Sequence, residues 1–376
     1  MKNLSQWWQL IQGTLFDCLE EELGPITKKQ QQLITALEIL RIEDNIKCYH
    51  GDRGRPKKNR IAIARAFVAK AIYNMPTTRI LLDRLQSDIN LRRICGWETV
   101  NMIPDESTFS RAFEEFSFTQ LLLKIHDTLI KTVYEEKIIG HLSRDSTAIN
   151  GREKSERTSY NNKKSKYKKG RPKKGERRPV KEASRIEKQK DMNLEEMIID
   201  LPKICDAGTK KNSKGKTETW IGYKLHIDSA DADIPISCIL TSASTHDSQV
   251  AIPLAELSNN KVINLYDLMD AAYDVQEISD HSKSLNHVPI IDVNPRRDAK
   301  LKEDLLEEKK VQKFLHWESS TKIHYNNRSA AERVNGRLKD EFGGRSVRVR
   351  GHEKVLCHLM FGILALTVDQ LIRFIQ

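Results

Sequence analysis

The stretch from Tyr325 to Lys339 constrains this chain most, because it combines helix-forming residues with four different polar groups at helical spacing. These four are Tyr325, Arg328, Glu332 and Lys339. At about 100° per residue they fall within roughly 60° of one another around a helix axis. Within the stretch, Gly336 is the residue least suited to a helix. We therefore expect a helix over most of this stretch, with a phenol, a guanidinium, a carboxylate and an ammonium on one face. The alternative is a charged helix in water, where Arg and Glu four residues apart are common.

Composition and charge indicate a water-soluble protein that binds a polyanion. The 376 residues are enough for two or three domains, and the net charge is +11. The segment from Arg152 to Lys190 holds 17 Lys and Arg against 5 Glu, so it accounts for the whole excess of positive charge. Such a block favours nucleic acid as the partner, although a solvated linker has the same composition. We expect no membrane partner, because charged residues interrupt the longest apolar run, Leu356 to Ile375.

The six cysteines are scattered, without metal-ligand spacing. They suit a reducing cytoplasm, where free cysteines are small buried apolar residues, and we expect no zinc site.

Residues 1–135 read as a helical domain. Apolar residues recur at helical spacing in Ile61 to Tyr73 and again in Ile80 to Ile94. A loop that begins at Ile103 leads into a further helix whose N-cap is Asp105 or Ser107. This order is typical of a helix-turn-helix reader of DNA, in which Ser107 and Arg111 would contact phosphates or bases, although any small helical bundle contains such turns.

One short phrase occurs twice, as Arg53-Gly-Arg55-Pro-Lys-Lys and as Lys169-Gly-Arg171-Pro-Lys173-Lys174. Both copies resemble the core of an AT-hook. Extended backbone at Arg-Pro with flanking cations can lie in a narrow A·T minor groove. We therefore treat Arg53, Arg55, Arg171, Lys173 and Lys174 as candidate DNA contacts, with non-specific attraction to phosphates as the alternative.

Residues 136–376 read as an α/β domain with a basic insertion at 150–215 that is too polar to form a core. A short apolar strand from Ile138 ends near Asp145, where a buried carboxylate is costly unless something ligates it. A β-hairpin follows at 218–240 with its turn at 228–233, then a helix at 249–257. A strand at 262–269 leads into Asp270, and a short strand occupies 288–291. An amphipathic helix begins near Glu353.

Three motifs resemble those of the DDE-type insertion-sequence transposases. Tyr-x2-Arg-x3-Glu-x6-Lys matches a signature of one large group of that family, Asp145 stands in an Asp-x-Thr context, and Asp270 in one like Asp-x-Gly-Tyr-Asp, with Ala272 in place of Gly. The resemblance implies a ribonuclease H-like mixed sheet preceded by an all-α DNA-binding domain. In that fold the first and fourth strands are neighbours, so Asp145, Asp270 and Glu332 would meet and hold two Mg²⁺ or Mn²⁺ ions. Tyr325, Arg328 and Lys339 would contact phosphates.

The resemblance further implies a bacterial, cytoplasmic, nucleoid-associated enzyme. It would bind the terminal repeats of an insertion sequence, cut and rejoin double-stranded DNA, and act as a homodimer. The alternatives are a domesticated DNA-binding protein that no longer cuts and a ribonuclease H-like hydrolase that cleaves without joining.

Several residues near these motifs have competing interpretations. Asp267 or Asp274 can replace Asp270 as the second acid, and Asp274 can instead support it. His246 and Asp247 can assist the metal ligands or contact DNA, but Asp247 also suits a helix cap. Arg296 and Arg297 are candidates to face DNA, with a solvated loop as the alternative. Three aspartates resemble a cation-binding cluster, but a hairpin turn, where Asp is common, explains them: Asp228, Asp231 and Asp233.

Overall fold

A six-stranded mixed sheet organises the C-terminal part of the chain in the computed structural model. The structure describes residues 15–46, 57–135, 137–156, 183–211, 215–296, 298–315 and 317–375. The strands are β1 (Ile138–Asn150), β2 (Asp206–Lys211), β3 (Thr217–Ala230), β4 (Ile234–Ser242), β5 (Ile263–Met269) and β6 (Val288–Ile291).

Strand β1 lies inside the sheet and is the strand from which the site is built. It pairs antiparallel with β3 and parallel with β5, which in turn pairs parallel with β6. β4 and β2 both pair antiparallel with β3, at different parts of its length. The neighbouring positions of β1 and β5 confirm the predicted adjacency of the first and fourth predicted strands, and the mixed sheet fits a ribonuclease H-like domain.

Two strand predictions need correction. β1 continues five residues beyond Asp145 to Asn150, so Asp145 lies within a strand and not at its end. β3 continues to Ala230, so Asp228 lies in the strand and not in the hairpin turn. The turn itself is the short 3-10 helix η4 (Asp231–Asp233).

The N-terminal region is helical, as predicted. Its bounds follow local capping: Thr27 and Gln30 form a capping box, and the Asn59 side chain accepts from two backbone amides at the start of α4. The predicted helix from Ile80 to Ile94 is wrong, because Asp88 ends one helix and caps the next. The helices are α2 (Phe16–Leu23), α3 (Lys28–Leu40), α4 (Arg60–Ile72), α5 (Thr78–Ser87), α6 (Ile89–Cys95), α7 (Glu106–Phe118) and α8 (Leu121–Tyr134), with η2 (Ile42–Asn45) and η3 (Val100–Met102) between them.

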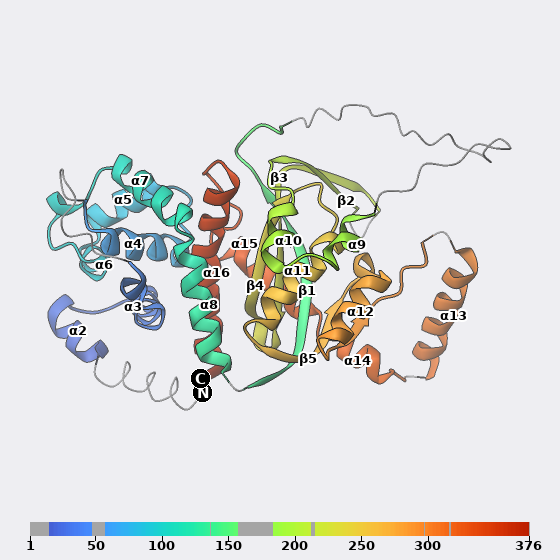
Figure 1. Cartoon of the computed structure of the whole chain (residues 1–376). Helices are drawn as coiled ribbons and strands as arrows, with labels where there is room; N and C mark the ends of the chain where they lie inside the picture. Colours follow the sequence, from blue (N-terminus) through green and yellow to red (C-terminus); the bar gives the residue numbers. More distant parts are fainter. Residues whose placement is uncertain are drawn as a thin grey trace.

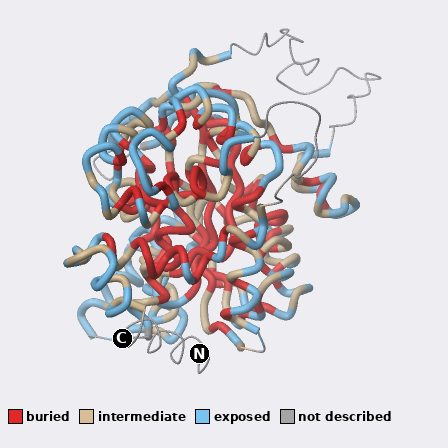
Figure 2. The backbone as a smooth tube through the Cα atoms, turned by 90° about the vertical axis from the view of Figure 1, so that its left-hand side faces the viewer, coloured by how far each residue is buried: buried red, intermediate tan, exposed pale blue. Residues whose placement is uncertain are grey.

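The last helix, α16 (His352–Ile375), joins the helical region to the sheet. It packs against α3, α4, α7 and α8 on one side and β4 on the other, as Figure 1 shows. By length and composition α16 is apolar enough to cross a membrane, but most of it is buried, which is typical of the core helix of a soluble protein. Phe67, Phe113 and Phe361 pack together where α4, α7 and α16 meet. Figure 2 shows buried backbone concentrated along the middle of the molecule.

The remaining helices of the C-terminal part are α9 (Arg185–Gln189), α10 (Leu194–Asp200), α11 (Ser248–Asn259), η5 (Ala271–Tyr273), α12 (Gln276–Ser284), α13 (Ala299–Leu315), α14 (Ser320–Asn326) and α15 (Ser329–Asp340). α11 packs on β3 and β4, whereas α15 packs on β1 and β3. Within the predicted insertion at 150–215, α9, α10 and β2 are regular structure, and capping boxes at Ser184 and Asn193 start the two helices.

Candidate active site

Asp145 on β1 and Asp270, which directly follows the neighbouring strand β5, lie side by side. Ser143 on β1 is the parallel partner of Leu268 on β5, so two residues further along each chain the register brings Asp145 next to Asp270. Burial raises the pKa of Asp145 to about 6, and the negative charge of Asp270 acts in the same direction. Two carboxylates that are poorly hydrated and close together favour a bound cation or a shared proton.

Asp270 begins η5 immediately after β5. Its Oδ1 accepts a hydrogen bond from the Ala272 amide at 2.9 Å. Burial raises the pKa of its carboxyl, and the charge of Asp247 contributes to the rise. The side chain is therefore fixed by the backbone of the turn that follows the strand, and it points to the same end of the sheet as Asp145.

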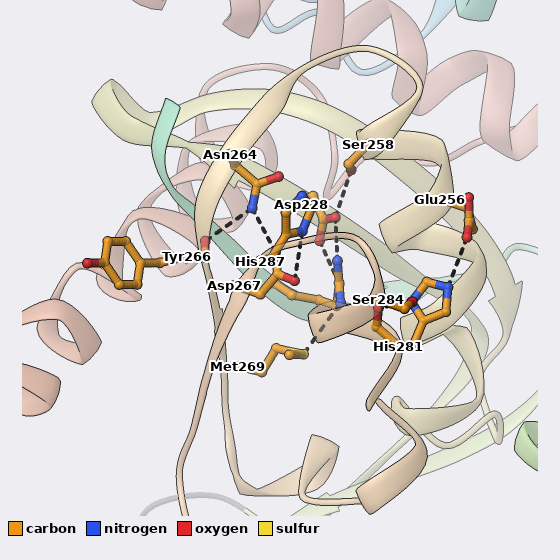
Figure 3. Close-up of polar contacts among 11 residues, drawn as sticks. Asp228, Glu256, Ser258, Asn264, Tyr266, Asp267, Met269, His281, Ser284 and His287 are labelled. Carbon is orange, nitrogen blue, oxygen red and sulfur yellow. Dashed lines mark hydrogen bonds and ion pairs between the residues drawn. The ribbon is translucent and has the colours of Figure 1, made fainter. Parts of the chain in front are cut away.

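The two competing acids near Asp270 are occupied elsewhere. Asp267 is buried between His287, whose Nδ1 lies 3.2 Å from Oδ2, and Asn264, whose Nδ2 donates to Oδ1 at 2.9 Å (Figure 3). Its pKa is lowered, because the hydrogen bond from His287 favours the charged form despite burial. Asp274 accepts from the Asn294 amide at 2.9 Å and so holds the loop after β6. These contacts favour Asp270 as the second acid.

Glu332 lies on α15, which packs across β1, but its carboxylate does not join the two aspartates. Its side chain is 57% exposed, and Arg328 Nη2 donates to Glu332 Oε1 at 2.6 Å. One turn further along, Asn335 Nδ2 donates to Asp145 Oδ2 at 3.1 Å. Among the described residues no group of three His, Cys, Asp or Glu side chains is placed to hold a metal ion. The predicted convergence of three acids is therefore incomplete in this structure.

The stretch from Tyr325 to Lys339 is helical for most of its length, as predicted, but it is divided between two helices. α14 ends at Asn326, α15 begins at Ser329, and Arg328 is the N-cap of α15. The Arg328 guanidinium lies 5.6 Å from the centroid of the Tyr325 ring, so the side chains on either side of the break still meet. Burial lowers the pKa of Lys339, and the neighbouring cations Arg345 and Lys210 lower it further.

Lys210 on β2 is a cation of the site that the sequence did not single out. Its positive charge lowers the pKa of both Asp145 and Asp270, as does that of Arg328. Lys210 is exposed near the end of an edge strand and belongs to the segment predicted to be a basic insertion. In the sequence it is one lysine among many there, and its effect on the charges of Asp145 and Asp270 identifies it.

On the other side of β1, the residues that flank Asp145 are held by acids. Arg144 makes a bidentate ion pair with Asp228, both bonds at 2.8 Å, and both side chains are almost fully buried. Ser258 of α11 donates to the same Asp228 carboxylate at 2.7 Å (Figure 3). The second flanking residue, Ser146, hydrogen-bonds to Asp247.

Asp247 occupies the cap position of α11 without making a side-chain capping bond. Its Oδ1 instead lies 3.2 Å from Lys224 Nζ and 3.7 Å from His226 Nδ1. Burial opposes the charged form, but His226 and Lys224 outweigh it and lower the pKa of Asp247. The capping explanation for Asp247 is therefore wrong. His246 contacts Ser248 within its own turn, at 2.8 Å between Nδ1 and Oγ.

The candidate DNA contacts of the N-terminal part are only partly placed. Ser107 and Arg111 lie together on the exposed side of α7, where Arg111 Nε donates to the Ser107 carbonyl at 3.2 Å. Asp105 is the N-cap residue of α7 but makes no side-chain capping bond. The second AT-hook-like segment and the first four residues of the other lie outside the described residues, and with them Arg53, Arg55, Arg171, Lys173 and Lys174.

Two family models match this chain, and both describe transposase domains. The model "Transposase DDE domain" matches residues 185–368, a range that includes Asp270 and Glu332 and begins after Asp145. The model "Transposase domain (DUF772)" matches residues 23–115 in the helical region. The comparison with curated proteins gave no match. The two matches span most of the sequence, and together with the mixed sheet and its adjacent acids they give one conclusion: this chain is a DDE-type insertion-sequence transposase, a metal-dependent enzyme that cuts and joins DNA.

Proposed function

We propose that Asp145, Asp270 and Glu332 are the catalytic acids of this transposase and that they hold two Mg²⁺ or Mn²⁺ ions. The observation that supports this most is the pairing of β1 with β5, which brings Asp145 and Asp270 together at one end of the sheet. Both carboxyl groups have raised pKa values because of burial, so a divalent cation would replace the missing hydration.

The side chains present fit a hard divalent ion. Carboxylate oxygens are the ligands that Mg²⁺ prefers, and Asp145 supplies them from β1 and Asp270 from the residue directly after β5. Glu332 fits only after a local change, because its carboxylate is bonded to Arg328 in this structure. A DNA phosphate that binds Arg328 would release that carboxylate. When bound, the two metal ions supply an activated water or 3′-hydroxyl and stabilise the leaving oxygen.

The cations around the acids are suited to hold the DNA strand. Arg328 can make bidentate contacts to phosphate, and Lys339, further along α15, supplies a point charge. Lys210 approaches the same acids from β2, so the charges of α15 and β2 flank Asp145 and Asp270. Together with Tyr325, these residues would place a phosphodiester between the two elements, as the Tyr-Arg-Glu-Lys signature implies.

The helical region would recognise the transposon ends. We infer a division into a DNA-binding domain at 1–135 and a catalytic domain at 136–376, with Ser107 and Arg111 as phosphate or base contacts on α7. The two AT-hook-like segments would add minor-groove or phosphate contacts. Strand transfer needs two ends at once, so the active assembly would be a homodimer on DNA, associated with the nucleoid.

Single substitutions test the acids directly. Asp145→Asn, Asp270→Asn and Glu332→Gln should each reduce metal-dependent nicking of end DNA by at least about 10³-fold, because each removes a charge that the metals require. Gel-shift affinity for the same DNA should stay within a few-fold of wild type. Asp280→Asn on α12 and Glu341→Gln at the end of α15 are matched controls that should nick normally. Variants of the three acids that still nick at the wild-type rate, or that lose DNA binding in parallel with nicking, would exclude these roles.

A further inference from the structure

Two histidines that are far apart in the sequence meet beside the candidate site. His141 lies on β1 and His324 on α14, and His141 Nε2 is 2.7 Å from His324 Nδ1. Both rings stack on Tyr266, with centroids 5.4 Å away for His141 and 4.5 Å away for His324, each inclined by 22°. Tyr266 is the parallel partner of His141 on β5. Figure 3 shows its side chain extending away from the buried contacts of Asp267 and His287.

The bonds around this histidine pair define its proton arrangement. Asp231 Oδ1 lies 3.1 Å from His141 Nδ1, and Asp231 is itself fixed because its Oδ2 accepts from the Gly140 and His141 amides at 3.0 and 3.2 Å. A carboxylate can only accept here, so His141 Nδ1 carries the proton. When His141 is neutral, its Nε2 accepts from the Nδ1–H of His324. In this neutral form the donation runs from His324 through His141 to Asp231.

The histidine pair is a principal attachment of α14. None of the seven residues of α14, all of which the structure describes, is buried, so apolar packing contributes little to its position. Just after the helix, the hydroxyl of Ser143 donates to the Asn327 carbonyl at 3.3 Å. His141, Ser143 and Asp145 alternate along β1, and they contact His324, Asn327 and Asn335 in the same order.

The turn η4 fixes both helices at once. Its first residue, Asp231, orients His141 and through it α14, while Asp233 forms two bonds of 2.7 Å with Arg333 on α15. Tyr325 follows His324 directly, and Arg328 comes four residues after His324. The row formed by Tyr325, Arg328 and Glu332 is thus held between an attachment at His324 and another at Arg333.

We propose that His141 and His324 are positioning residues of the transposase, which set Tyr325, Arg328 and Glu332 against the strand that carries Asp145. They touch neither the acids nor DNA in this role; they act through α14. The inference rests on the proposed function, because it assigns the histidine pair the task of placing residues whose roles are proposed above.

Variants of His324 separate its hydrogen bond from its ring. His324→Phe keeps the stacking on Tyr266 and loses the donor, whereas His324→Asn keeps a donor close to the Nδ1 position and loses the ring. We expect His324→Phe to lower the nicking rate at saturating end DNA by about 10- to 100-fold, since misplacement by about 1 Å costs this much. The DNA concentration that gives half of the maximal nicking rate should change by less than about threefold. His324→Asn should recover part of the rate. The control His281→Phe removes a histidine of α12 that pairs with Glu256 on α11, and this variant should nick normally.

A double variant tests whether the two histidines act as one unit. If they do, His141→Ala combined with His324→Ala should be no slower than the worse single variant. Nitrogen-15 spectra of the folded wild type should show His324 with its proton on Nδ1, and that signal should be lost in His141→Ala. Additive rate losses, an equal loss in His281→Phe, or wild-type rates in His324→Phe would overturn the positioning role. Those outcomes leave the proposed function intact if Asp145→Asn still abolishes nicking; nicking by Asp145→Asn would instead remove the proposed function itself.

Discussion

The two faces of β1 differ in how their polar side chains are satisfied. On the α11 face, Arg144 pairs with Asp228, which also accepts from Ser258, and both charges of the ion pair are almost fully buried. On the α15 face, Asp145 accepts from two neutral donors, the Asn335 side chain and the Ser146 backbone, and its pKa is raised because burial outweighs them. Adjacent residues of one strand therefore serve opposite purposes. The α11 face holds the strand in place, and the α15 face keeps a carboxylate in need of a cation.

This contrast explains how the sheet stays folded although the buried charge of Asp145 is poorly compensated. A buried ion pair is weak evidence for net stability, but a partner left alone in the interior is strongly destabilising. The Arg144–Asp228 pair thus fixes the path of β1 on either side of Asp145, and Asp247 does the same for Ser146. Burying the Asp145 carboxylate costs free energy, but it does not displace β1, because these contacts hold the strand in position.

The largest expected effect comes from breaking the α11 face. Asp228→Ala leaves the Arg144 guanidinium buried without its carboxylate, which should lower the free energy of unfolding by about 3–5 kcal/mol. Denaturant titration followed by circular dichroism measures this. The matched control replaces both partners, as Arg144→Met with Asp228→Leu, and should recover most of the loss because no charge is left unpaired. If Asp228→Ala cost less than about 1 kcal/mol, the two faces would not differ as described.

The contribution of Asp145, on the α15 face, to the free energy of unfolding should change with pH in the opposite sense to that of a carboxylate in a stabilising ion pair. The pKa of Asp145 is about 6 in the folded protein against an ordinary value of 3.8, so the folded state holds this proton more tightly than the unfolded chain. The associated stability is complete below pH 3.8 and is lost as pH rises through about 6. Asp145→Asn should therefore be more stable than metal-free wild type at pH 8, by about 1–2 kcal/mol, with a smaller difference at pH 5.

Metal ions offer the control for that pH experiment. Mg²⁺ or Mn²⁺ should raise the thermal midpoint of wild type at pH 8 and leave Asp145→Asn nearly unchanged, because the ion binds only the folded site. A difference between the two proteins that stays constant from pH 5 to pH 8 would contradict the raised pKa of Asp145. An equal metal shift in both proteins would place the ion elsewhere.

How much of the fold and of the candidate site could be predicted depends on how far apart in the sequence the contacting residues lie. The pairing of Asp145 with Asp270 followed from local patterns, since two apolar strands each lead into an acid and the family resemblance supplied their adjacency. Asp228 was misplaced in a turn because Asp is common there, whereas the residue that explains it, Arg144, lies 84 residues away. The break at Asn327 and Arg328 was missed for a similar reason. Good helix formers flank it, and contacts from Ser143 and η4 decide where the two helices begin and end.

The smallest expected effect concerns Gly336, which lies on α15 between Glu332 and Lys339, one turn from each. A Cβ at this position would meet no atom within 4 Å, and its backbone is helical, so nothing in the free protein requires glycine. Gly336→Ala should raise the free energy of unfolding by about 0.5–1 kcal/mol, because alanine loses less backbone entropy in a helix. Thermal unfolding of the metal-free protein measures this.

The same substitution tests whether the α15 face is where DNA lies. Gly336 destabilises the free helix, so its presence between Glu332 and Lys339 needs an explanation. A close approach of the DNA backbone would provide one, since an added methyl group would then interfere. Gly336→Ala should accordingly weaken binding to end DNA by a few-fold while it stabilises the free protein. The control Ser320→Ala at the start of α14 adds no methyl group to that row and should bind normally. Stabilisation with unchanged DNA affinity would move the DNA path away from this turn of α15, and the contrast between the two faces of β1 would then concern the metal site alone.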